Sequence, residues 1–548
     1  MIWRFFKMKR NILLLIVCLA LVCLAAPVFG SGQSGGSASG GNSSAGGQVA
    51  NMNLTGYPIA VQPVNLSVAV NKRPQHNRSV AEFEYMIDLE KKTNVKVQWI
   101  EWEAAQVDEK RQLAFATNML PDVFLTSVGS MVNYYGKQGQ LAPLNNLIKN
   151  YAPDIWNAIQ AQPNVIGMMT NPDNGNWYSM AQIRDPMYVV LSDPDLFINK
   201  KWLDNLGLKV PETITEFYNA LKEFKAKDAN GNGNPNDEIP FAFCYQEGSP
   251  QYSYTGFYIM FFPFGVAENN LHLMPVNGKL QHTFTMPQFR DGVRLYADMY
   301  KDGLIDPESF TYNRQQLFAA CKAKEVGAAI GYAPDITFGS DKVSNYVTLY
   351  LKGPNGQNPA YYRNSEFGGP GTGPSISASC KTPEIAIRWL NEFYKPELSA
   401  QQMYGVLGKY LVPSKDPQYT YQVADPPAGM TYDEYRFTVS NGLGLDFYMP
   451  KNLVPNTAVA KKESDAAKSG YFIKDGLPNF VFNDAEMNEI QPMQTELNTF
   501  AMTTLANWIV KGTVDSEWDQ VQQQLSRMKL PRYLEIYQQV YDRMKAAQ

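Results

Sequence analysis

Hydrophobic residues alternate with polar ones, or recur every three to four positions, through most of the chain, and these two periods predict strands and helices. Strands are expected at residues 64–70 (VNLSVAV), 95–99 and 121–126, and helices at 80–92 and 104–117. This strand–helix–strand–helix–strand order favours a mostly parallel sheet with helices on its faces.

A second region of the same kind follows. Thr213 and Glu216 have the spacing of a capping box, which predicts the start of a helix that ends near Lys227. The chain has 548 residues, enough for more than one core, so the fold class is α/β with more than one lobe. Further helices are expected at 288–301, 383–394 and 515–545, and a strand at 325–332.

The amino-terminal segment has the pattern of an export signal. Basic residues precede an apolar run at 12–26, and residues 28–30 offer a small-residue cleavage site, so residues 1–30 are expected to be a signal peptide. Residues 31–52 are Gly/Ser-rich and predict a flexible linker. Cys18 and Cys23 lie inside the apolar run, so a lipid anchor at the membrane surface stays open, and the protein is expected to be extracellular, secreted or tethered.

Charge and cysteine usage exclude several classes of protein. Removal of residues 1–30 takes away four of 48 basic and none of 52 acidic residues, so the net charge becomes −8. This argues against nucleic acid as a partner. The remaining Cys244, Cys321 and Cys380 show no CxxC spacing, and the chain has three His, so neither a disulfide scaffold nor a zinc site is expected.

Residues 228–240, DANGNGNPNDEIP, place oxygen-bearing side chains at alternate positions of a Gly-rich loop. Such oxygens can converge on Ca²⁺, which takes roughly 6–8 of them. The loop is not a standard EF-hand, because Ile239 stands where the bidentate Glu is expected. A polar turn without metal is the alternative. The candidate ligands are Asp228, Asn230, Asn232, Asn234 through its backbone carbonyl, Asp237 and Glu238.

Several phrases resemble the family 1 extracellular solute-binding proteins of ABC sugar transporters. The similarity is greatest to large oligosaccharide-binding lipoproteins and to alginate-binding proteins. The phrases are LPDVF at 120–124, LAPLNNLIKNYAP at 141–153, residues 196–241 including the candidate calcium loop, DGLIDP at 302–307 and PEIAIRWLNEFY at 383–394.

The resemblance implies a type II periplasmic-binding-protein-like fold, with two α/β lobes, a hinge and an interlobe ligand cleft. It also implies a structural Ca²⁺, ABC permease partners, and a monomer that captures a sugar and releases it unchanged. Family loops place the Asp-Glu pair one residue nearer than here, so Asn236 is a further candidate ligand. The expected lobes are 53–175 with 328–440, and 176–327 with 441–548.

Candidate ligand-binding residues follow the expected strands, because ligands of open α/β sheets bind outside the carboxyl ends of strands. Aromatic rings and polar side chains suit the CH faces and hydroxyls of sugars. For each ring, packing in the core is the alternative. The candidates are Trp102, Ser127 and Tyr332 after strands, Trp177, Tyr178 and Arg184 in or after a turn-rich segment, and Tyr254 and Tyr258 beside an apolar run.

Two other functional classes stay open. A secreted glycosidase or lyase would need two carboxylates facing each other across a cleft, and sequence alone cannot pair them. A cell-wall attachment module would fit the signal and linker but not the two α/β regions. HExxH and P-loop motifs are absent, and GxSxG and GxGxxG spacings occur only in the Gly/Ser-rich residues 30–36, outside any expected strand or helix, so binding without catalysis is favoured.

Overall fold

The computed structural model describes residues 49–546 except 74–75, 164, 181–182, 184–193, 246–255, 340, 362–368, 416, 418–420, 431, 441–452 and 455–466. The expected signal peptide and nearly all of the expected linker lie outside the described residues. The linker was expected to reach residue 52, but Met52 is buried in the first core, so the folded part begins earlier. Among the described helices, none has both the length and the apolar character needed to cross a membrane.

The first sheet has the predicted parallel arrangement. Its strand order is β10-β3-β1-β2, and β1 pairs in parallel with both β2 and β3. Val68 at the centre of β1 faces Trp99 on one neighbour and Val123 on the other. β10 joins the edge in antiparallel orientation. The strands are β1 (Val64–Lys72), β2 (Val95–Glu103), β3 (Val123–Phe124) and β10 (Ser375–Ile376).

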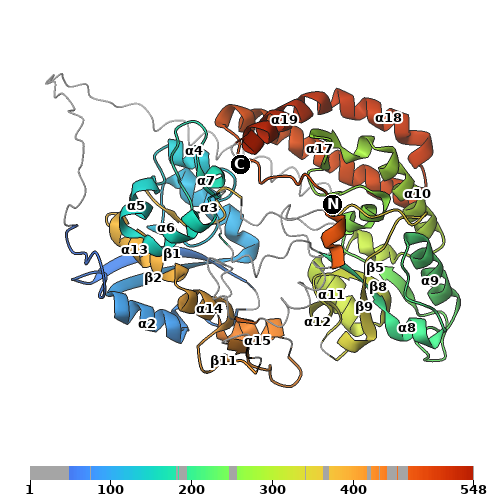
Figure 1. Cartoon of the computed structure of the whole chain (residues 1–548), viewed down its shortest axis with the longest axis horizontal. Coiled ribbons are helices and arrows are strands. Elements are labelled where there is room, and N and C mark those ends of the chain that lie inside the picture. The colour runs from blue at the N-terminus through green and yellow to red at the C-terminus, as the bar shows by residue number, and fades with distance from the viewer. Residues whose placement is uncertain are drawn as a thin grey trace, which may run out of the picture. The chain divides into compact units, whose positions relative to one another are not determined.

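Helices cover this sheet, and several of them surround β1 and β2 in Figure 1. Asn94 and Asn118 end two of these helices in the left-handed conformation that Asn tolerates, with φ of 59° and 55°. The helices are α2 (Glu84–Thr93), α3 (Val107–Thr117), α4 (Val132–Lys137), α5 (Asn145–Tyr151), α6 (Pro153–Ala161), α7 (Val165–Met169), α13 (Pro383–Asn391) and α14 (Pro396–Tyr404), with 3-10 turns η1 (Val80–Glu82), η2 (Ala104–Gln106) and η8 (Glu392–Tyr394).

The second sheet is mixed and has the order β5-β8-β4-β9. β5 and β8 are parallel, whereas β4 runs antiparallel to both β8 and β9. The strands are β4 (Asp195–Asn199), β5 (Ile239–Ala242), β8 (Val326–Gly331) and β9 (Tyr346–Leu349), and a separate hairpin is formed by β6 (Leu273–Val276) and β7 (Lys279–His282).

The capping box predicted for the helix before the candidate calcium loop is confirmed. The Thr213 hydroxyl accepts a hydrogen bond from the Glu216 amide at 3.2 Å, and the Glu216 carboxylate accepts one from the Thr213 amide at 3.1 Å. The other elements of this region are α8 (Lys200–Asn205), α9 (Ile214–Ala226), α10 (Pro287–Lys301), α11 (Arg314–Ala323), α12 (Pro334–Phe338), and the 3-10 segments η4 (Phe257–Phe264), η5 (Thr283–Thr285), η6 (Pro307–Phe310) and η7 (Val343–Asn345).

The carboxyl-terminal third adds long helices to the second core. The expected helix 515–545 is two helices, because Lys529 between them adopts a φ of 62°. A 28-residue helix before them was not predicted. The elements are α17 (Asp484–Lys511), α18 (Val514–Arg527) and α19 (Leu530–Ala546), preceded by η9 (Ser469–Tyr471) and by a small unit of β11 (Leu411–Pro413), β12 (Tyr421–Val423), β13 (Leu453–Val454) and α15 (Tyr432–Val439).

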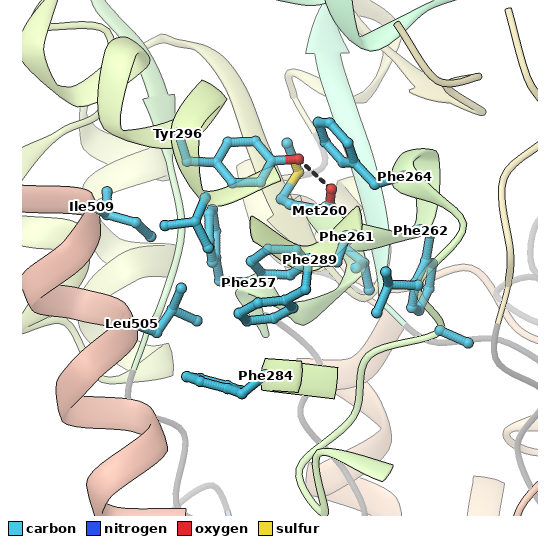
Figure 2. Close-up of a cluster of buried hydrophobic side chains, with 14 of the residues drawn as sticks. Phe257, Met260, Phe261, Phe262, Phe264, Phe284, Phe289, Tyr296, Leu505 and Ile509 are labelled. Atoms are coloured by element: carbon cyan, nitrogen blue, oxygen red, sulfur yellow. Dashed lines mark hydrogen bonds between the residues drawn. The ribbon is translucent and has the colours of Figure 1, made fainter. Parts of the chain in front are cut away.

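An aromatic cluster forms the centre of the second core (Figure 2). Phe261 from η4 stacks on Phe289 from α10, with ring centroids 4.2 Å apart. The buried Tyr296 hydroxyl donates a hydrogen bond to the Met260 carbonyl. Leu505 of α17 belongs to the same cluster, so the unpredicted helix seals this core.

The extents of the two cores differ from the expected lobes. The first draws on residues 52–183 and 376–394, and the second on 196–361 and 477–541. Residues 328–361 were expected in the first lobe, but β8 and β9 hydrogen-bond to β4 in the second sheet. Residues 176–183 were expected in the second lobe, but Trp177 and Ile183 are buried in the first core.

His282 at the end of β7 should make the second core sensitive to acid. The side chain is 1% exposed, neither ring nitrogen has a hydrogen-bond partner among the described residues, and burial together with His272 lowers the pKa well below 6.5. As the pH falls below about 6.5, the unfolded chain therefore binds a proton that the folded chain does not, and stability is lost.

We expect His282→Leu to reduce the fall in melting temperature between pH 7 and pH 5. Gln281→Leu, at the exposed neighbouring position, should keep the fall seen in the unsubstituted protein. His76 titrates in all three proteins and does not affect the comparison. Identical pH dependence of His282→Leu and the unsubstituted protein would contradict the assignment.

Candidate functional site

The carboxyl ends of β1, β2 and β3 lie at one edge of the first sheet because the three strands are parallel. Glu101, near the end of β2, organises this edge. Its carboxylate accepts hydrogen bonds from the Ser79 hydroxyl at 2.6 Å and the Val80 amide at 2.7 Å, and lies 3.1 Å from the Lys72 ammonium. Burial alone would raise the pKa of Glu101, but these three donors together lower it. The segment after β1 is therefore held against β2.

Ser127, predicted as a ligand contact, joins two segments that are far apart in the sequence. Its hydroxyl donates to the Gly371 carbonyl at 2.8 Å and accepts from the Gly129 amide at 3.0 Å. Gly371 has a φ of 73°, and a Cβ there would lie 2.1 Å from the Gly129 carbonyl oxygen. Ser127 thus holds the backbone segments at Gly129 and Gly371 close together at the sheet edge. Its role in ligand binding stays a prediction.

Three of the predicted aromatic contacts are buried and have packing partners. Trp102 packs on Phe124, with ring centroids 6.1 Å apart. The Trp177 indole donates to the Thr170 hydroxyl at 3.0 Å. The Tyr178 hydroxyl accepts hydrogen bonds from two nearby Asn amides, at 2.9 and 3.1 Å. Their exposed fractions of 9%, 5% and 4% favour the packing alternative.

The remaining predicted contacts divide between described and undescribed residues. Tyr332 directly follows β8, is half-buried, and so lies where a strand-end contact was expected. Tyr258 is half-buried in η4 and packs against the second core. Arg184 and Tyr254 lie outside the described residues.

A buried ion pair near the carboxyl end of β8, beside which Tyr332 lies, was not predicted. Asp195 begins β4 and faces Gly331 at the end of β8 because these strands are antiparallel. Its carboxylate pairs with the Lys468 ammonium, and the two side chains are 3% and 2% exposed. The ammonium lies 5.3 Å from the centroid of the Tyr361 ring. No local motif marks this pair, since its members are separated by 273 positions.

The segment after β1 was also missed, although it meets the strand-end rule applied to Ser127. Arg73 and His76 follow the last residue of β1, and both approach the ring of Phe437 on α15. This segment leaves the same sheet edge as the segments after the second and third strands.

The candidate calcium loop is closed by its own hydrogen bonds. The Asp228 carboxylate accepts from the amides of Gly231, Asn232 and Gly233 at 2.8 to 3.0 Å. The Asn230 and Asn232 side-chain amides donate to Asp237 at 3.0 and 2.8 Å. The second of these bonds is the main cause of a lowered pKa at Asp237.

Glu238 turns into this loop and is 4% exposed. One carboxylate oxygen accepts from the Ala229 amide at 2.9 Å, and the other has no partner among the described residues. Asn234 accepts from the Asn236 amide through its side chain, and the Asn236 side chain is exposed. In the described part of the chain, no three His, Cys, Asp or Glu are grouped closely enough to hold a metal, so a site here would need Asn oxygens.

Substitution of Trp177 distinguishes packing from ligand contact. Removal of this buried ring should lower the free energy of unfolding by about 3–5 kcal/mol, because a large cavity replaces it. Guanidinium unfolding of Trp177→Ala measures this change. Tyr134→Ala, at a position 43% exposed, should change it by only about 0.5 kcal/mol. A similarly small change for Trp177→Ala would mean that the ring is not a packing element.

Comparisons with known proteins agree with this architecture. A family model described as bacterial extracellular solute-binding protein matches residues 73–400. The fructooligosaccharide ABC transporter substrate-binding protein FusA of Streptococcus pneumoniae serotype 4 (strain ATCC BAA-334 / TIGR4) is 28% identical over 483 residues, which cover 84% of this chain and 86% of FusA.

Solved structures show the same relationship. FusA of S. pneumoniae in complex with kestose has a TM-score of 0.78 at 26% identity, covering 88% of this chain and all of that chain. A FusA EF-hand mutant in complex with fructo-nystose has a TM-score of 0.76 at the same identity and coverage. The alginate-binding protein AlgQ2 without calcium ion, at 22% identity and covering 90% of this chain and all of that chain, has a TM-score of 0.68 and shares the fold.

The predicted family and fold are therefore confirmed. The type II periplasmic-binding-protein-like architecture accounts for two α/β cores that each draw on separate stretches of sequence. Since the family model spans more than half of its length, the chain belongs to the bacterial extracellular solute-binding protein family.

Proposed function

We propose that this protein captures an oligosaccharide outside the cell and delivers it unchanged to the permease of an ABC importer. It is the substrate-binding component of an ABC sugar importer. The observation that carries the choice of ligand is the near full-length likeness to FusA, which has been solved in complex with kestose. The candidate contacts Ser127 and Tyr332 follow strand ends, where such sheets bind ligands.

Binding without catalysis is supported by the carboxylates at the two sheet edges. A glycosidase needs one carboxylic acid to donate a proton and a second carboxylate opposite it. Glu101 is held by Lys72 and two loop donors, and Asp195 pairs with Lys468 in a buried site. Both carboxylates stabilise the fold as charged acceptors, a role that does not supply a mobile proton.

The proposal includes export through the apolar amino-terminal segment and a tether of the folded part by the Gly/Ser-rich stretch. The first 48 residues lie outside the described structure, so their sequence alone supports this step. A monomer is expected, since one chain supplies both cores.

A structural calcium ion in the loop 228–238 is also part of the proposal. The donors in this loop are oxygens, and one buried oxygen of Glu238 lacks a partner among the described residues. Asp228, Asn230, Asn232, Asp237 and Glu238 would hold the ion, with the Asn234 carbonyl and Asn236 as further candidates. When bound, the ion would neutralise the loop carboxylates and take no part in chemistry.

Incubation with fructooligosaccharides should raise the melting temperature without releasing products. A ligand at one hundred times its Kd adds about 2.7 kcal/mol to the free energy of unfolding. Differential scanning fluorimetry with kestose and larger oligosaccharides measures binding, and chromatography of the same samples measures hydrolysis. Tyr332→Ala should weaken the response, and Tyr218→Ala on α9 should not. Cleaved sugar would identify an enzyme, and a response to polymer alone would identify an attachment module.

Removal of calcium should destabilise the second core. A chelator is expected to lower the melting temperature of the purified protein, and added Ca²⁺ should restore it. Asp228→Ala should be insensitive to both, whereas Asp204→Ala, which removes an exposed partner of Lys200, should respond like the unsubstituted protein. An unchanged melting temperature with chelator would remove the calcium assignment and leave the transport function in place.

A further inference from the structure

Four residues from two distant segments meet beyond the carboxyl end of β1. We call Arg73, His76, Arg436 and Phe437 the Phe437 cluster. The Arg73 guanidinium carbon lies 5.6 Å from the centroid of the Phe437 ring, and that of Arg436 lies 4.7 Å from it. The His76 ring centroid is 5.0 Å away, at an interplanar angle of 55°. Two cations thus share one buried aromatic ring, which partly offsets their mutual repulsion.

The His76 imidazole presents a hydrogen-bond donor to this cluster. The Arg73 backbone amide donates to Nδ1 at 3.4 Å, which places the proton of the neutral ring on Nε2. Nε2 is buried and has no partner among the described residues, and the side chain is only 7% exposed. A buried donor without an acceptor costs free energy that an incoming acceptor would recover.

The charges that act on His76 are predominantly positive. Burial, with Arg73, Arg436 and Lys72, lowers the pKa of His76 to about 4, and Glu101 opposes this change. The ring is therefore neutral near pH 7. The Glu101 carboxylate is already held by Lys72, Ser79 and Val80 and balances the Lys72 charge. The two guanidinium groups and the imidazole N–H are all hydrogen-bond donors, and Arg436 already donates one bond, to the Met403 sulfur at 2.9 Å.

We propose that the Phe437 cluster binds an anionic group of the transported oligosaccharide, either a sugar carboxylate or a sulfate ester. This inference rests on the proposed oligosaccharide-binding function and specifies that the ligand is negatively charged. A guanidinium group can bind two oxygens of a carboxylate or of a sulfate ester at once by paired hydrogen bonds. The Nε2–H of His76 supplies a third donor. The position after β1 is at the sheet edge where ligands of this architecture bind.

Titration calorimetry with matched ligands tests the charge requirement. The probes are a galacturonate trisaccharide, its fully methyl-esterified form, a sulfated galactose trisaccharide and kestose. We expect the carboxylated or the sulfated probe to bind at least tenfold more tightly than the methyl ester. The stronger of the two identifies the anion. Raising the salt concentration should reduce this difference, because partly exposed charges are screened.

Substitutions assign the effect to the cluster. Arg73→Gln and Arg436→Gln should each remove most of the preference for the acidic probe. Arg78→Gln is the matched control, because Arg78 lies in the same segment and packs on Phe83, 4.8 Å from that ring centroid. Arg73 is exposed, so its substitution tests the proposal even where Arg436→Gln reduces folding.

Two results would overturn the assignment and leave the oligosaccharide function intact. One is that neither the carboxylated nor the sulfated probe binds more tightly than the methyl ester, or that kestose alone binds. The other is an equal loss of affinity for acidic and neutral probes in the Arg73 and Arg436 variants. Failure of every saccharide to bind would overturn the proposed function as well.

Discussion

The parallel pairing of β1 with β2 and β3 is the constraint on which the candidate site depends. Parallel strands bring their carboxyl ends to one edge, and each chain segment that leaves this edge can present side chains to a ligand. Glu101 fixes the first of these segments through Ser79 and Val80, and Ser127 ties the third to Gly371. Glu101 and Ser127 are therefore occupied in holding loops, whereas the buried Nε2–H of His76 in the Phe437 cluster has no partner among the described residues.

Sequence periodicity was sufficient to predict those helices and strands whose structure is decided by local interactions. The strand at 64–70, the helix after Thr213 and the helix at 288–301 are present because their hydrophobic spacing favours the conformation that packing requires. The helix after Thr213 also has its capping box. The family resemblance supplied the two-lobed fold. The helix α17 was missed although Asn483 and Glu486 form a capping box and its buried residues recur every three to four positions from Ile490 to Ile509. Pro492 in its interior is the feature that argues against a helix there.

The site was predicted less well, because its partners are distant in the sequence. Asp195 and Lys468, or Arg73 and Phe437, come together only once the sheets are assembled. The aromatic residues were informative in a different way. Trp102, Trp177 and Tyr178 are predicted sugar platforms, but their burial favours packing: Trp177 lies in the first core, and Trp102 and Tyr178 lie in a separate buried cluster with Phe124. An aromatic surplus therefore reflects packing here more than recognition.

The interleaving of the two cores has a consequence for biosynthesis. The first core contains residues as late as 394, and the second is closed by helices that end near the carboxyl terminus. At a synthesis rate of about 5–20 residues per second, the growing polypeptide spends tens of seconds without a complete hydrophobic interior. Neither core can therefore be completed until a distant segment has been synthesised, so the topology makes the folding of each core wait for much of the chain.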